Sequence, residues 1–175
     1  LGDFNNTEFV ADGEEYYFSN KDGKYIVRTK DINGDLTDYP IAYTFGVTPL
    51  QQYLIKFPDG KIQTLRATWD ADSNRWFNQY VGDTIPHADW LHWQQGGQRW
   101  NTMCAECHST NLQVNYEQST DTFATSWSEI NVGCEACHGP ASAHIAEAQS
   151  GSLSGRKGLL LSLDDHGRAV WQMNA

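Results

Sequence analysis

The first hundred residues consist of short runs of aromatic and β-branched residues, separated by polar turns that contain glycine. Tyr16–Phe18 precedes the turn at 20–23, and Lys24–Thr29 follows it, which is a pattern typical of a β-hairpin. Further runs at 39–45, 52–57 and 62–69 are separated by polar or glycine-containing segments. The pattern therefore predicts an antiparallel β-meander of about four to six strands.

The pattern changes from Trp90 onward, where tryptophans gather ahead of four cysteines that all lie between positions 104 and 137. An alanine-rich stretch at 141–148 follows a Gly-Pro pair and predicts a helix. Apolar runs at 159–163 and 169–173 flank a polar turn and predict a closing hairpin. We therefore expect an α+β fold: an N-terminal antiparallel β-meander, a mostly helical or irregular region, and a short C-terminal hairpin. Residues 1–89 would form a β-rich lobe, and residues 90–175 a compact region that carries the cysteines.

Composition narrows the possible functions. The chain has 175 residues, a net charge of −10 and a pI near 4.8, which argues against binding to nucleic acid or to an anionic membrane surface. A basic redox partner remains compatible with this charge. No run of 18 apolar residues is present, so we expect no membrane span. Leu1 opens without a signal peptide, which would fit a removed leader or an excerpt of a longer chain.

Two copies of C-x-x-C-H use every cysteine in the chain: Cys104-Ala105-Glu106-Cys107-His108 and Cys134-Glu135-Ala136-Cys137-His138. This spacing is the attachment signal for c-type haem. Two thiols one helical turn apart can add to the two vinyl groups on one porphyrin edge. The adjacent histidine, His108 or His138, then supplies the proximal iron ligand. The sequence therefore predicts two covalently bound haem c groups.

Three other uses of the cysteines fit the sequence less well than haem attachment. A zinc site with four cysteine ligands would join the two C-x-x-C pairs, but 26 residues separate them, beyond the usual spacing of about 12–20. A thioredoxin-like C-x-x-C needs a βαβ context, which this sequence lacks. Disulfides within C-x-x-C would be strained and reducible. Haem attachment is the favoured interpretation, and a zinc-stabilised binding module is the main alternative.

Electron-transfer haems need a second axial ligand, usually His or Met. The candidates are His87, His92, His144, His166, Met103 and Met173. His144 lies six residues beyond His138 on the predicted helix, so it stays near the proximal side of its own haem and is better placed to bind a different one. His92 lies in the aromatic cluster before the first motif, which suits a haem pocket or an ordinary core. His144 and His92 are the favoured iron ligands beside the two motif histidines.

Several stretches of the chain resemble a family of multihaem c-type cytochromes related to the tetrahaem cytochromes of nitrification, whose members often carry tetratricopeptide repeats. They are Tyr43-Thr44-Phe45-Gly46-Val47-Thr48-Pro49-Leu50-Gln51-Gln52-Tyr53, His92-Trp93, Trp100 to Leu112, Trp127 to Pro140, and His144. The resemblance implies export, closely packed haems and mostly bis-histidine ligation. The position of His144 matches one that commonly supplies a distal ligand in this family, and the match at His92 is looser.

The sequence also departs from the family, because relatives usually have further C-x-x-C-H motifs before and after the stretch that matches this chain. The chain therefore looks like an internal fragment, and its partners would include redox proteins and further haem domains of the same protein. We expect electron transfer in a periplasmic or extracellular location, with an electron carrier favoured over an enzyme. A catalytic multihaem oxidoreductase with one open haem iron is the second hypothesis.

Overall fold

The protein is described by a computed structural model that covers residues 1–151, 161–163 and 169–171. Its internal contacts divide the chain into two units, and the backbone passes between them three times. The first, called here the β unit, comprises Leu1–Glu106 and Gln113–Ser126. The second, called the motif unit, comprises Cys107–Leu112 and the chain from Trp127 onward. The division into regions 1–89 and 90–175 stays a prediction.

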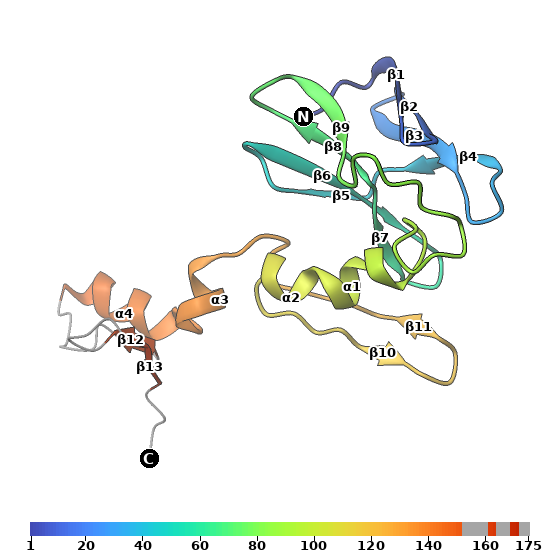
Figure 1. The fold of residues 1–175 in the computed structure, drawn as a ribbon. Coiled ribbons are helices and arrows are strands. Elements are labelled where there is room, and N and C mark those ends of the chain that lie inside the picture. Colours follow the sequence, from blue (N-terminus) through green and yellow to red (C-terminus); the bar gives the residue numbers. More distant parts are fainter. Residues whose placement is uncertain (152–160, 164–168, 172–175) are drawn as a thin grey trace. The chain divides into compact units, whose positions relative to one another are not determined.

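Four strands form the N-terminal sheet of the β unit, each antiparallel to the next (Figure 1). They are β1 (Asn5–Ala11), β2 (Glu14–Lys21), β3 (Lys24–Lys30) and β4 (Leu36–Pro40). The hairpin predicted around residues 20–23 is confirmed, because Lys21 pairs with Lys24 and leaves only Asp22 and Gly23 in the turn. Both turn residues have positive φ, 53° and 79°, as a type I′ turn requires.

The second sheet has the order β5-β6-β8-β9, with β7 paired to β6 as well. Its strands are β5 (Tyr43–Phe45), β6 (Leu50–Lys56), β7 (Ile62–Thr64), β8 (Ala67–Asp70) and β9 (Arg75–Asn78). The runs predicted at 39–45 and 62–69 are each broken into two strands. The second break falls at Leu65 and Arg66, because β7 pairs with one end of β6 and β8 with the other. Residues 1–78 therefore contain nine strands, more than the sequence predicted.

Large aromatic side chains from both sheets make up the core of the β unit. The rings of Phe18 and Trp76 stack with centroids 3.7 Å apart and planes 4° apart. Phe4 packs edge-on against both of these rings, with centroids at 5.4 and 5.7 Å. Edge-to-face contacts such as those of Phe4 are an arrangement that aromatic rings prefer. This core fixes the two sheets against each other and gives the following segment a rigid support.

Short elements follow the sheets. They are the 3₁₀ helix η1 (Gly96–Gln98), α1 (Trp100–Met103), α2 (Ala105–His108), β10 (Tyr116–Glu117), β11 (Thr122–Phe123), α3 (Cys134–His138), α4 (Ser142–Ser150), β12 (Leu161–Leu163) and β13 (Ala169–Trp171). The helix predicted at 141–148 is confirmed as α4, which ends at Gly151 with φ 72°, a common C-terminal cap. The predicted C-terminal hairpin is confirmed as the antiparallel pair β12–β13.

The expected α+β class is therefore correct: antiparallel sheets come first, then a few short helices and a final hairpin (Figure 1). None of the helices that the structure describes is both long and apolar enough to cross a membrane.

Candidate haem-attachment sites

The first motif begins where a short helix ends. Cys104 is the C-cap of α1, and its φ of −119° and ψ of −36° remain in the helical region before α2 continues. The C-x-x-C spacing therefore falls on about one helical turn, as attachment to one porphyrin edge requires. Cys104 is half-buried and Cys107 is exposed, whereas Ala105 between them is fully buried.

Asn101 anchors the helix that leads into this motif. It is fully buried, and its side-chain oxygen accepts a hydrogen bond from the backbone N–H of Ile62 at 2.7 Å. Its side-chain nitrogen donates to the carbonyl of Gly60 at 3.2 Å and to the hydroxyl of Thr125 at 2.8 Å. One side chain thus joins α1 to β7, to the turn before β7 and to the segment after β11. Cys104, three residues later, starts from a fixed position in the β unit.

The second motif occupies the whole of α3. The carboxylate of Glu135 accepts a hydrogen bond from the backbone N–H of Ala141 at 2.7 Å and so links α3 to the start of α4. A pocket of about 330 Å³ lies between these elements. Its lining residues are Cys134, Glu135, His138, Gly139, Ala141 and His144. The structure thus brings together Cys134, His138 and His144, which the sequence predicts to be an attachment cysteine, a proximal ligand and a distal ligand, around one pocket.

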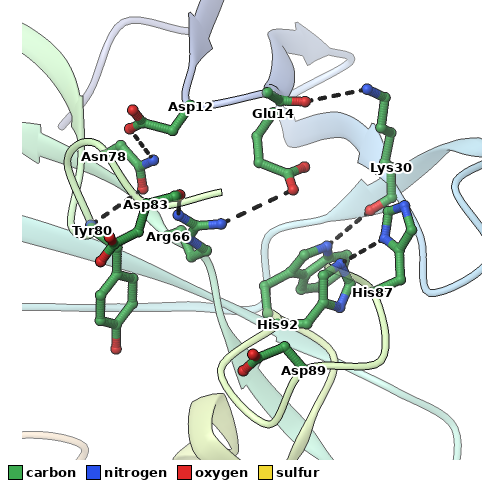
Figure 2. Close-up of polar contacts among 12 residues, drawn as sticks. Asp12, Glu14, Lys30, Arg66, Asn78, Tyr80, Asp83, His87, Asp89 and His92 are labelled. Carbon is green, nitrogen blue, oxygen red and sulfur yellow. Dashed lines mark hydrogen bonds and ion pairs between the residues drawn. The ribbon is translucent and has the colours of Figure 1, made fainter. Parts of the chain in front are cut away.

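His92, the other predicted distal ligand, lies in the interior of the β unit with no exposed surface. Its Nδ1 accepts from the backbone N–H of Gln94 at 3.3 Å, and its Nε2 lies 3.2 Å from Nδ1 of His87 (Figure 2). With Nδ1 acting as an acceptor, the proton must be on Nε2, which then donates to His87. Burial, the neighbouring His87 and Arg66 lower the pKa of His92 to about 4. The ring is therefore neutral at pH 7, but both of its nitrogens already have partners.

The other candidate ligands are placed as follows. Met103 is 55% exposed directly beside Cys104. His87 lies beside His92 in the β unit. His166 and Met173 lie outside the described residues.

Sequence reasoning missed a buried charged pair in the β unit. Arg66 has no exposed surface, and its Nη1 lies 4.0 Å from Oε1 of the buried Glu14 (Figure 2). Its Nη2 donates to the carbonyl of Asp83 at 3.2 Å, and the guanidinium lies 5.4 Å from the ring centroid of Tyr80. Arg66 thus contacts the segment that follows β9 at two points. No local pattern identifies it, because arginine is normally an exposed residue.

The alternatives to haem gain no support from the site. All four cysteines, each within the described residues, are free thiols. Within the ranges that the structure describes, no three His, Cys, Asp or Glu side chains gather as a metal cluster.

The two helices at the second motif, α3 and α4, are left without a packing partner that would bury their side chains among the residues that the structure describes. Neither α3 nor α4 buries any residue. Helices of five and nine residues are marginal by themselves, so a porphyrin held against them would supply the missing burial. The residues present therefore fit haem c, with cysteine tethers and a histidine ligand in each motif.

A match to a protein-family model agrees with this chemistry. The sequence model of the family described as "Cytochrome c554 and c-prime" matches residues 87–139, a segment that contains both C-x-x-C-H motifs and ends before His144. Among solved structures, the chain is similar to the outer cell wall cytochrome OcwA, with a TM-score of 0.41 and 22% identity, over 68% of this chain and 22% of that one. No curated protein matched the chain. The family match supports a haem-binding protein of the c-type cytochrome class.

Proposed function

We propose that this chain is a dihaem segment of a multihaem c-type cytochrome and that it transfers electrons. The observation that carries the proposal is the presence of two complete C-x-x-C-H motifs on helical turns, both inside the segment that the cytochrome family model matches. Each pair of thiols would tether one haem, and the haem iron supplies the one-electron chemistry. The protein's part is to hold and orient the two groups and to control their access to water.

His108 and His138 would be the proximal ligands. His144 is proposed as a distal ligand, which is supported by its place on α4, where it lines a pocket together with Cys134 and His138. His92 is proposed as the other distal ligand. To bind iron it would have to give up its contact with His87 or the hydrogen bond from Gln94, since these use both ring nitrogens. Bis-histidine ligation would favour lower reduction potentials than His/Met ligation.

The buried position of His92 favours one second candidate, a multihaem oxidoreductase. If His92 stays paired with His87, one haem could keep an open or displaceable axial position. An iron with such a position can bind a small exogenous ligand, whereas a six-coordinate iron serves electron transfer. Binding of carbon monoxide to the reduced protein separates the two functions, because a bis-histidine dihaem protein would not bind it at either iron.

The cellular location and the electron-transfer partners are proposed from the cytochrome class. Haem is attached to C-x-x-C-H outside the cytoplasmic membrane, so we propose a periplasmic or extracellular location. The chain spans 22% of the length of the cytochrome OcwA, and further haem domains of the same protein are proposed as its immediate electron donors or acceptors. Relation to the tetrahaem cytochromes of nitrification is part of the same proposal.

The test is to export the chain in a host with haem-maturation machinery and to measure covalent haem. We expect a haem-stained band on a denaturing gel and two irons per chain. Replacing Cys134 and Cys137 with alanine should lower the iron content to one per chain, and replacing Cys104 and Cys107 should do the same. An unstained chain in the presence of active machinery would refute the proposal.

A further inference from the structure

Thr110 lies two residues after the iron ligand of the first motif, and it is only 2% exposed. Its backbone forms an isolated antiparallel bridge with Glu129. The Thr110 N–H donates to the Glu129 carbonyl at 2.9 Å, and the Ser128 N–H donates to the Thr110 carbonyl at 2.9 Å. These bonds join the end of the first motif to the segment that leads into the second, and every residue involved belongs to the motif unit.

The side chain of Thr110 continues this link up to the second motif. Its hydroxyl accepts a hydrogen bond from the backbone N–H of Gly133 at 2.8 Å and donates one to the carbonyl of Asn131 at 2.9 Å. Gly133 is the N-cap residue of α3 and directly precedes Cys134. The hydroxyl therefore uses its donor on Asn131 and one acceptor site on Gly133, both within the three residues that precede the second motif.

Glycine at position 133 is part of the same arrangement. A Cβ atom there would lie 2.7 Å from Oε2 of Glu129 and 3.4 Å from the hydroxyl oxygen of Thr110. The first distance is too short for a real contact, so a side chain would push Glu129 aside. A Cβ atom would meet the Thr110 hydroxyl at an ordinary contact distance, so the close neighbour of Gly133 is the end of the flexible Glu129 side chain.

We propose that Thr110 is a positioning residue that holds the start of the second motif against the segment after His108, and so sets the distance between His108 and His138 within the motif unit. The inference rests on the proposed function, because it concerns the haems that these motifs would hold. Thr110 follows His108 by two residues and contacts the residue before Cys134, so it is a short connection between the two iron sites. The electrostatic interaction between two redox centres depends on their distance, and a change at Thr110 therefore alters how strongly the haems sense each other.

The test uses the matured, haem-loaded chain and two variants. T110V keeps the shape of the side chain but removes both hydroxyl hydrogen bonds, whereas T110S keeps the hydroxyl and serves as the matched control. The first readout is the number of covalent haems, which tests the proposed function separately. The second is the spin–spin interaction between the two oxidised irons by electron paramagnetic resonance, together with the separation of the two reduction potentials.

We expect T110V to retain two haems but to change the spin–spin interaction and the potential separation, and T110S to resemble the parent chain. Unchanged coupling in T110V, with two haems bound, would overturn the inference. If the wild-type chain itself carries fewer than two haems, the proposed function fails instead.

A measurement on the unmodified protein keeps the inference testable if T110V does not fold. In the reduced wild-type chain the amide hydrogen of Gly133 should exchange with solvent about tenfold more slowly than a free amide, because it is bound to the Thr110 hydroxyl. T110S should preserve this protection. Free exchange of the Gly133 amide in the wild-type chain would show that the contact does not hold the second motif.

Discussion

Replacing Asn101 with alanine tests the connection between the β unit and the first motif. The substitution removes three hydrogen bonds and leaves the backbone N–H of Ile62 buried without its acceptor. A buried hydrogen bond contributes about 1 kcal/mol, and an orphaned buried donor costs about 1–3 kcal/mol. The three lost bonds alone predict a loss of about 3 kcal/mol in the free energy of unfolding of the β unit, and the orphaned donor can only add to it.

The assay is equilibrium unfolding in urea, followed by fluorescence of the tryptophans in the core of the β unit. For a chain of this size, a loss of about 3 kcal/mol corresponds to a fall of about 10 °C in the unfolding temperature. The matched control is N33A, because Asn33 is an exposed asparagine in a surface turn. N33A should change stability by less than about 0.5 kcal/mol. If N101A proves no more destabilising than N33A, the three bonds do not hold α1 in place.

Three further perturbations have defined outcomes. In the chain without attached haem, the folded state holds the pKa of His92 at about 4, below the ordinary 6.5, so the unfolded chain binds more protons between these values. The free energy of unfolding should therefore be highest above pH 6.5 and fall by up to about 3 kcal/mol as the pH is lowered toward 4. Urea unfolding of wild type should show this pH dependence, and H92F, which lacks the imidazole, should not show it. Replacing Arg66 with methionine should cost about 3 kcal/mol in the same assay because it leaves the Glu14 carboxylate buried without its partner, and the double variant with E14Q should recover part of that loss. In the motif unit, E135A should accelerate amide exchange at Ala141 whereas E135Q, which keeps an acceptor oxygen, should not; equal rates in the two variants would contradict the link between α3 and α4.

The parts of the fold that the sequence predicted are those determined by local chemistry. The turn at Asp22 and Gly23 was predictable because both residues favour positive φ, and the flanking runs alternate as strands do. The strand over Asn5–Ala11 was missed because it is a polar edge strand whose form depends on pairing with β2. The break at Arg66 was missed for a related reason, since two parts of one run pair with different ends of β6.

The same distinction applies to the site. The attachment residues could be predicted because covalent bonding to one porphyrin edge requires a fixed spacing along the chain. The role of Thr110 could not, because its partners lie 21 and 23 positions away and nothing in its own neighbourhood marks it as buried. The distal ligands stay predictions for this reason too: an axial ligand is selected by long-range folding around a bound group, and spacing alone does not determine it.

The backbone passes three times between the β unit and the motif unit, and this limits where the chain can be truncated without loss of contacts. A fragment ending at Glu106 would lose Gln113–Ser126, which supplies the Thr125 hydroxyl that Asn101 binds. A fragment starting at Trp127 would lose Thr110 and with it the partner of Gly133. Neither unit can therefore be cut out as one continuous piece of the chain. Recombination or gene fusion would have to transfer both units together to keep the surroundings of either C-x-x-C-H motif intact.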